Sequence, residues 1–151
     1  YDVNPSLIFS DEKKLKNKTV VLEKNVSKKI LPILRKIVTE KEGTASLANV
    51  NGYEIGGKTG TAQKSISGGY SNKKINTFIS IFPTSKPKFV LALMLDEPKT
   101  SKDYIYHFRD GSDIKYKGTP FNTAGWTTVE VAGQIVEKIG PILATKYSEV
   151  N

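Results

Sequence analysis

The sequence of 151 residues contains no cysteine, a single histidine and only two arginines. Without cysteine the chain forms neither disulfides nor thiolate metal sites, although this leaves its compartment open. The one histidine, His107, does not provide the paired ligands of a typical zinc site. We therefore expect no metal site and no cofactor.

Long apolar runs are also absent. No stretch of about 18 consecutive apolar residues occurs, so we expect no membrane-spanning helix within this sequence. The first residues, YDVNPSLIF, do not follow the charged-then-apolar order of a signal peptide. Hydrophobic residues make up 38% and charged residues 25% of the sequence, which is the balance of one globular domain.

The net charge of +8 suggests a nucleic-acid partner, but the scarcity of arginine argues against one. Proteins that read nucleic-acid sequence depend on the forked guanidinium group, and this chain has only Arg35 and Arg109. Its lysine cluster contains no interleaved aromatic residues and is typical of a solvated surface (Lys13, Lys14, Lys16, Lys18). We therefore expect no nucleic-acid partner.

Two segments have the apolar spacing of amphipathic helices. The first runs from Val26 to Val38, with Asn25 or Ser27 as the expected N-cap and an end near Gly43. The second lies near the C-terminus and has an apolar face of seven residues (Val129, Ala132, Ile135, Val136, Ile139, Ile142, Leu143). It follows a capping-box pattern formed by Thr127 and Glu130.

Between these helices, Ile75–Phe82 and Phe89–Leu95 have the β-branched and aromatic composition of strands. Only the six residues PTSKPK separate them, which is too short for a parallel crossover, so they form an antiparallel hairpin. Residues 1–24 read as an extended lead-in, and residues 99–125 as a long polar loop with a small hairpin around Asp110-Gly111. The predicted fold is α+β, with the terminal helices on one face of an antiparallel sheet.

The stretch NGYEIGGKTGTAQ contains two overlapping motifs that share Lys58. Residues Gly52 to Thr59 match the phosphate-loop pattern G-x-x-x-x-G-K-[ST], and Phe89–Asp96 imitates the strand that supplies a magnesium-binding carboxylate. A phosphate loop must open a helix, however, and the glycines and β-hydroxyl residues after Thr59 disfavour one. A nucleotide-binding protein is therefore the weaker alternative.

The same lysine begins Lys58-Thr59-Gly60-Thr61, the K-T-G signature of penicillin-recognising enzymes. On a strand, alternation places Thr59 and Thr61 on one face, and Gly60 removes bulk where a substrate approaches the backbone. A lysine with two neighbouring hydroxyls suits a terminal carboxylate. Taken alone, the four residues would fit an ordinary surface turn better than a binding strand.

A wider set of segments occurs in one order: Gly56–Lys64, Ile81-Phe82-Pro83, Leu95–Pro98 and Thr123–Trp126. Over roughly residues 26 to 143, this order resembles the C-terminal third of a class B penicillin-binding protein of the FtsI type. The resemblance implies a serine acyltransferase that cross-links peptidoglycan stem peptides during cell division and is inhibited by β-lactams. It also implies division-complex membrane proteins as partners and a location at the periplasmic face of the inner membrane.

By the same resemblance, Lys58 would balance the substrate carboxylate and help to polarise the hydroxyl network. Thr59 and Thr61 would bind that carboxylate, and Gly60 would keep the groove open. The backbone N–H of Thr61 would be one donor of the oxyanion hole.

Two further motifs of this family, S-x-x-K with the nucleophile and S-x-N, should precede the K-T-G strand. S-x-N is absent, and none of the four S-x-x-K matches opens an apolar helix (Ser10–Lys13, Ser71–Lys74, Ser85–Lys88, Ser112–Lys115). We therefore expect residues 1–151 to be the C-terminal part of a transpeptidase domain, inactive alone because the nucleophilic serine lies outside it. A non-catalytic cell-wall-binding module is the alternative of another class.

Overall fold

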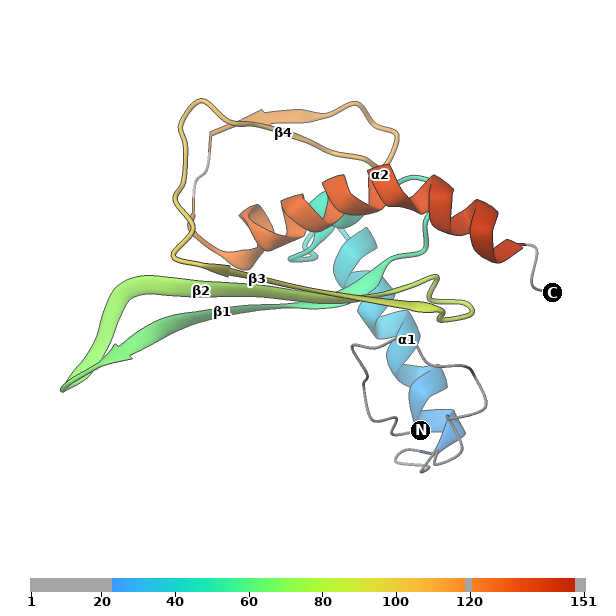
Figure 1. Cartoon of the computed structure of the whole chain (residues 1–151), viewed down its shortest axis with the longest axis horizontal. Helices are drawn as coiled ribbons and strands as arrows, with labels where there is room; N and C mark the ends of the chain where they lie inside the picture. The colour runs from blue at the N-terminus through green and yellow to red at the C-terminus, as the bar shows by residue number, and fades with distance from the viewer. Residues whose placement is uncertain (1–22, 119–120, 149–151) are drawn as a thin grey trace.

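A computed structural model describes residues 23–118 and 121–148. Helix α1 (Lys24–Thr39) leads through a short 3-10 helix, η2 (Ser46–Ala48), to the strands β1 (Gly56–Ile66), β2 (Gly69–Phe82) and β3 (Phe89–Asp96). A small hairpin of β4 (Ile105–His107) and β5 (Lys115–Lys117) follows. The 3-10 turn η3 (Ala124–Trp126) then precedes α2 (Thr128–Ser148) (Figure 1).

The three long strands form one antiparallel sheet in the order β1-β2-β3. The short link between β2 and β3 makes the predicted hairpin, in which Phe82 lies opposite Phe89. β1 pairs with β2 from Gly56 opposite Ile81 to Ile66 opposite Gly69. The expected antiparallel α+β fold is therefore confirmed.

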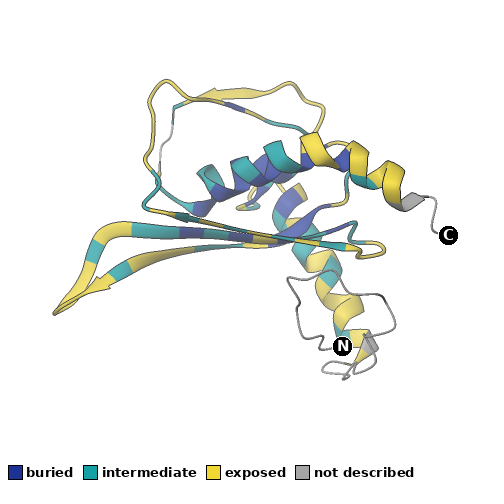
Figure 2. Cartoon of the chain, viewed as in Figure 1, coloured by how far each residue is buried: buried dark blue, intermediate teal, exposed yellow. Residues whose placement is uncertain are grey.

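The core lies between one face of the sheet and α2 (Figure 2). Alternate residues of β2 point toward it, and Phe78 is completely buried. Leu93 and Leu91 on β3 lie opposite Phe78 and Ser80 and pack against the same core. From α2 the core receives Val129, Ala132 and Val136, which belong to the predicted apolar face of that helix.

Helix α1 has a different position from the one we expected. α2 lies along one face of the sheet, whereas α1 passes the sheet beside β1, with its two ends on opposite sides (Figure 1). A Cβ atom on Gly56 would lie 3.1 Å from the backbone of Leu34 and Arg35, because the helix crosses so close to that strand. Only the C-terminal end of α1, through Val38, enters the core. The prediction of both helices on one face is correct for α2 alone.

The predicted N-cap of α1 is wrong, whereas α2 begins directly after Thr127 as the sequence predicted but without the capping-box bonds. α1 begins before Asn25 and Ser27, with Glu23 at the N-cap and no side-chain cap. At α2, Thr127 Oγ1 donates to the carbonyl of Thr123 at 2.9 Å, and the Glu130 carboxylate binds Arg109. Bonds to Thr123 and to Arg109 therefore take the place of the capping box. The expected lead-in falls almost entirely in residues 1–22, outside the described residues.

The segment 99–125 contains more structure than a loop. β4 and β5 pair around Asp110-Gly111 as the sequence predicted, with Tyr106 opposite Tyr116. The rings of Tyr106 and Trp126 meet edge to face at 5.0 Å, which joins this hairpin to the turn before α2. The aromatic residues of the segment thus pack locally.

Candidate substrate-binding site

The K-T-G residues lie on β1, the edge strand of the sheet. No helix begins at Lys58. β3, whose sequence imitates the strand that supplies a magnesium-binding carboxylate, runs antiparallel to its neighbour β2. Asp96 at its end forms an ion pair with Lys64 at 2.7 Å. This arrangement lacks the helix N-terminus that binds phosphates, so the nucleotide-binding alternative is wrong.

The free edge of β1 exposes the backbone of the two threonines. The hydroxyl of Thr77 on β2 donates to the carbonyl of Gly60 at 3.3 Å, so this carbonyl faces β2. Backbone groups of successive residues point to opposite sides of a strand, and those of Thr59 and Thr61 therefore face away from the sheet. The Lys58 ammonium donates to the Thr59 carbonyl at 2.8 Å on that edge. An extended peptide can add to such an edge as another strand.

The two threonine side chains lie on the same face of β1, as alternation predicted. Thr59 and Thr61 lie opposite Phe78 and Asn76, whose side chains point toward the α2 face. Thr59 Oγ1 lies 2.9 Å from Thr44 Oγ1, and Thr61 Oγ1 accepts a hydrogen bond of 2.9 Å from the N–H of Ala124. Both hydroxyls are therefore held on the α2 face by neighbouring segments, through Thr44 and Ala124.

The side chain of Lys58 leaves the opposite face of the strand, where it pairs with Ile79. This side chain is exposed, and its ammonium group lies at the strand edge because it bonds the Thr59 carbonyl there. The structure thus brings the charge of Lys58 and the outward backbone of Thr59 and Thr61 to one edge, while the threonine hydroxyls lie on the adjoining face.

The structure gives a further reason for a glycine at position 60, in addition to the one expected from the sequence. A Cβ atom at this position would lie 2.5 Å from the Thr77 hydroxyl, which occupies the space above the glycine. The missing side chain therefore makes room for the cross-strand hydrogen bond. Its predicted role in keeping a groove open remains a prediction.

An exposed ion cluster lies at the end of β3, beyond the K-T-G residues of β1. Lys64 lies 2.7 Å from Glu97, and Lys73 lies 3.2 Å from the same carboxylate. Hydrogen bonds from Lys64 and Lys73 lower the pKa of Glu97, and those from Lys64 to Asp96 and Glu97 raise the pKa of Lys64. Because the cluster is solvent-exposed, it contributes little to stability.

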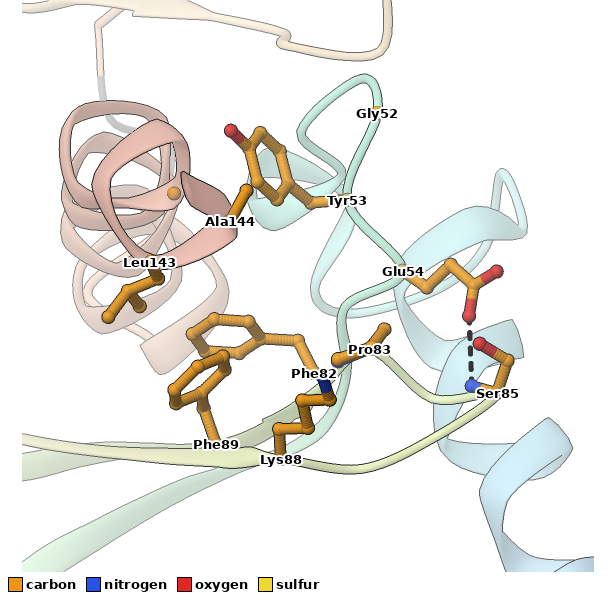
Figure 3. A pocket seen from close by; sticks show the side chains of 11 residues that line it. Gly52, Tyr53, Glu54, Phe82, Pro83, Ser85, Lys88, Phe89, Leu143 and Ala144 are labelled. Carbon is orange, nitrogen blue, oxygen red and sulfur yellow. Dashed lines mark hydrogen bonds between the residues drawn. The ribbon is translucent and has the colours of Figure 1, made fainter. Parts of the chain in front are cut away.

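A pocket of 420 Å³ opens on the α2 side of the sheet, at the link between β2 and β3 (Figure 3). Tyr53, Phe82, Phe89 and Leu143 form its apolar walls. At its rim the Glu54 carboxylate accepts the N–H of Ser85 at 2.8 Å. Phe82 and Phe89 lie on the face opposite to the Lys58 side chain, so the pocket is separate from the K-T-G edge.

None of the S-x-x-K serines described by the structure opens a helix. Ser71 lies in β2, Ser85 in the link after it, and Ser112 in the turn between β4 and β5. The fourth match, Ser10–Lys13, lies outside the described residues. Within residues 23–118 and 121–148, no cluster of three potential metal ligands occurs, and neither long helix is apolar enough to cross a membrane.

Sequence reasoning missed the groups that support the two threonines. Thr44 lies in the turn after α1, to which the sequence assigned no role, and Asn76 is a buried polar residue within an apparent apolar strand. The polarity of Asn76 in the middle of β2 was the one available signal. Its partners come from beyond residue 121 and have no spacing rule.

Comparison with known proteins decides the family. The model of the penicillin binding protein transpeptidase domain matches residues 2–110, more than half of the chain. The chain belongs to this transpeptidase family. The resemblance predicted from the K-T-G strand and its flanking segments is confirmed.

Relatives of the chain carry the name peptidoglycan D,D-transpeptidase FtsI or FtsI homolog. The probable peptidoglycan D,D-transpeptidase FtsI of Caulobacter vibrioides is 30% identical over 134 residues, which cover 83% of the chain and 20% of that protein. A peptidoglycan D,D-transpeptidase FtsI homolog of Chlorokybus atmophyticus is 45% identical over 80 residues, covering 52% of the chain and 12% of the relative. The chain therefore spans a fifth or less of the length of these curated relatives.

A solved structure shows the same fold. The apo transpeptidase domain of penicillin-binding protein 3 from Burkholderia pseudomallei superposes with a TM-score of 0.65 at 24% identity. The match covers 92% of this chain and 35% of the solved one. The described sheet and helices are thus one part of a transpeptidase-domain fold.

Proposed function

We propose that this chain supplies the substrate-binding strand of a serine-type peptidoglycan D,D-transpeptidase that acts in cell division. The observation that carries the proposal is the free edge of β1, where the Lys58 charge and the outward backbone of Thr61 lie together. Membership of the transpeptidase family supplies the chemistry in which such an edge is used.

In the proposed reaction a serine, supplied by a part of the enzyme other than the described residues, attacks the D-Ala-D-Ala bond of a stem peptide. The terminal D-Ala leaves with the proton of the serine hydroxyl, and the acyl group passes to the amine of a stem peptide on a neighbouring peptidoglycan strand. β-Lactams acylate the same serine. No step requires a cofactor.

Lys58, Thr59 and Thr61 have distinct tasks in this scheme. Lys58 attracts the carboxylate of the acyl donor and polarises the hydroxyl network around it. Thr59 and Thr61 donate their hydroxyls to that carboxylate. The outward N–H of Thr61 stabilises the oxyanion, a contact whose loss typically costs about 3 kcal/mol in the transition state.

The same proposal places the enzyme at the periplasmic face of the inner membrane, where peptidoglycan and other membrane proteins of the division complex are its partners. The similarity to the FtsI-named protein of the bacterium Caulobacter vibrioides supports this location. The anchor would lie in a part of the enzyme other than the described residues, because none of their helices crosses a membrane.

The test is acylation kinetics of a protein that carries this chain within a complete transpeptidase domain. Lys58→Met removes the charge and keeps most of the side-chain packing. Because charge-assisted contacts contribute about 1.5–3 kcal/mol, acylation by penicillin should slow about ten- to a hundredfold. An ester donor without the terminal carboxylate should lose much less.

Equal losses on both donors would mean that Lys58 acts on the nucleophile network and not on the carboxylate. No loss on either donor would remove Lys58 from the site. A wild-type protein that binds peptidoglycan but is never acylated would favour a non-catalytic wall-binding module instead.

A further inference from the structure

Asn76 is a polar residue at the centre of the sheet. It lies on β2 between Thr61 on β1 and Leu95 on β3, and its exposed fraction is 0%. A buried amide costs free energy unless it forms hydrogen bonds. The contacts of this amide therefore indicate why an apolar residue does not occupy the position.

Both hydrogens of the Asn76 amide reach the segment 122–127, the stretch between the aromatic hairpin and α2. Nδ2 donates to Asn122 Oδ1 at 3.0 Å and to Thr127 Oγ1 at 2.9 Å. One side chain of the sheet thus holds both ends of this segment.

The orientation of the amide follows from the neighbouring bonds. Asn122 Nδ2 lies 2.8 Å from the carbonyl of Pro98, which can only accept, so Asn122 must present its oxygen to Asn76. Asn76 must then present its nitrogen. Its own Oδ1 is buried and has no partner among the described residues. The residue therefore acts through its two donors, at the cost of an unpaired acceptor.

The segment held by Asn76 makes a backbone hydrogen bond to the K-T-G strand. Between Asn122 and Thr127, the N–H of Ala124 donates to Thr61 Oγ1 at 2.9 Å. A hydroxyl has one hydrogen and can accept as well as donate. Because Thr61 Oγ1 accepts from Ala124, its hydrogen must point elsewhere. Thr61 is exposed, and no other described group takes that hydrogen.

Thr59 provides a contrast on the same strand. Its hydroxyl faces the hydroxyl of Thr44 at 2.9 Å, and either group can be the donor. The polarity of Thr59 is therefore not fixed by its neighbour, whereas that of Thr61 is fixed by a backbone N–H.

We infer that Asn76 is a positioning residue: by holding the segment 122–127, it directs the Ala124 N–H at Thr61 and leaves the Thr61 hydroxyl as a donor for the carboxylate of the acyl donor. A carboxylate accepts hydrogen bonds and cannot donate them, so it fits a hydroxyl of this fixed polarity. The inference rests on the proposed function for the identity of the ligand. The network itself does not depend on that function.

The kinetic test compares two acyl donors on a protein that carries this chain within a complete transpeptidase domain. Asn76→Ala should slow acylation by benzylpenicillin about tenfold, the range of one lost hydrogen bond to a charged group. An ester donor without a carboxylate should change less than about twofold, since it never uses this contact. Equal losses on the two donors would mean a general structural role and would overturn the inference.

Thr127→Val is the second variant: it removes one of the two Asn76 contacts together with the Thr127 bond to the Thr123 carbonyl, both of which order the segment, and it keeps the contact of Asn76 with Asn122. It should also slow the penicillin reaction selectively. Thr127→Ser is its matched control, since serine keeps the hydroxyl, and it should behave as wild type. A serine variant as slow as the valine variant would show that keeping the hydroxyl does not preserve the reaction, and would contradict the role given to this hydrogen bond.

A second readout is amide hydrogen exchange at Ala124, which needs no activity. Exchange at Ala124 should be at least about tenfold faster in both Asn76→Ala and Thr61→Val than in wild type. Thr61→Val removes the acceptor of this N–H, and Asn76→Ala removes the two bonds that hold the segment carrying it. Unchanged exchange at Ala124 in Asn76→Ala would overturn the inference. If the wild type is not acylated at all, the proposed function fails, and the exchange result still decides whether Asn76 positions Thr61.

Discussion

Arg109 and Glu130 form a two-bonded ion pair inside the protein. Nη1 and Nη2 of Arg109 donate to the two carboxylate oxygens of Glu130 at 2.9 and 2.8 Å. The side chains are 6% and 5% exposed. Because Arg109 follows β4 and Glu130 lies in the first turn of α2, the pair fastens the aromatic hairpin to the helix.

Breaking this pair should destabilise the fold strongly. Glu130→Gln leaves the Arg109 charge buried without its full partner, and the free energy of unfolding should fall by about 3–5 kcal/mol. Urea unfolding followed by circular dichroism measures this change. Glu137→Gln is the matched control, because Glu137 bonds the same arginine at 3.1 Å but is 59% exposed. It should cost about 0–1 kcal/mol, and similar losses in both variants would contradict the assignment.

The pair also predicts an acid-sensitive stability. Burial opposes ionisation of Glu130, but the hydrogen bonds from Arg109 and Gln134 outweigh it and hold the pKa of Glu130 below its ordinary value of 4.5. The unfolded chain therefore binds this proton at higher pH than the folded one. The contribution is complete above pH 4.5 and disappears as the pH falls through the lower folded value.

Unfolding free energies of wild type and Glu130→Gln should therefore converge as the pH is lowered from 7 toward 3. Other acidic groups contribute equally to both proteins and cancel in the difference. A constant difference across this range would contradict a lowered pKa.

Neighbouring residues of β2 should differ sharply in their effect on stability. Phe78 is 0% exposed in the core, whereas Ile79 is 56% exposed on the other face. Phe78→Ala should cost about 3–5 kcal/mol, and Ile79→Ala should stay within about 0.5 kcal/mol. Thermal and urea unfolding test the register, since a slip by one residue would exchange the two results.

Gly60 and Thr77 should be coupled. Gly60→Ala places a methyl group against the Thr77 hydroxyl and should cost about 1–3 kcal/mol. Thr77→Ala removes the obstructing atom, so the double variant should regain a large part of this loss. A double-mutant cycle in urea unfolding measures the coupling, and strictly additive losses would show that Thr77 is not the obstacle.

The chain by itself should not be labelled by penicillin. The nucleophile and its base act as a unit, and a binding strand does not replace them. Intact-mass analysis after incubation with benzylpenicillin should show the unmodified protein, and a D-Ala-D-Ala ester should not be hydrolysed. Stoichiometric covalent labelling at Ser71, Ser85, Ser112 or Ser10 would show that one of the S-x-x-K matches is functional.

Local patterns in the sequence were enough for the hairpin and for the K-T-G strand. A six-residue link permits only an antiparallel pair, and threonine and glycine after Lys58 disfavour a helix. The same reasoning failed where a distant group competes with a local one. Thr127 and Glu130 have capping-box spacing, but Asn76 and Arg109 bind them instead. The path of α1 beside β1 depends on tertiary packing, which helical periodicity does not encode.

The face of the sheet that carries the Lys58 side chain has consequences for handling the protein in solution. Val90 and Met94 are 71% and 68% exposed there, next to Ile79. They belong to β3, an edge strand of eight residues without an inward charge or a proline before its final aspartate. Such edges act as templates for pairing between copies. Concentrated preparations of this chain should therefore self-associate, more readily at high salt, where the repulsion due to its positive charge is screened.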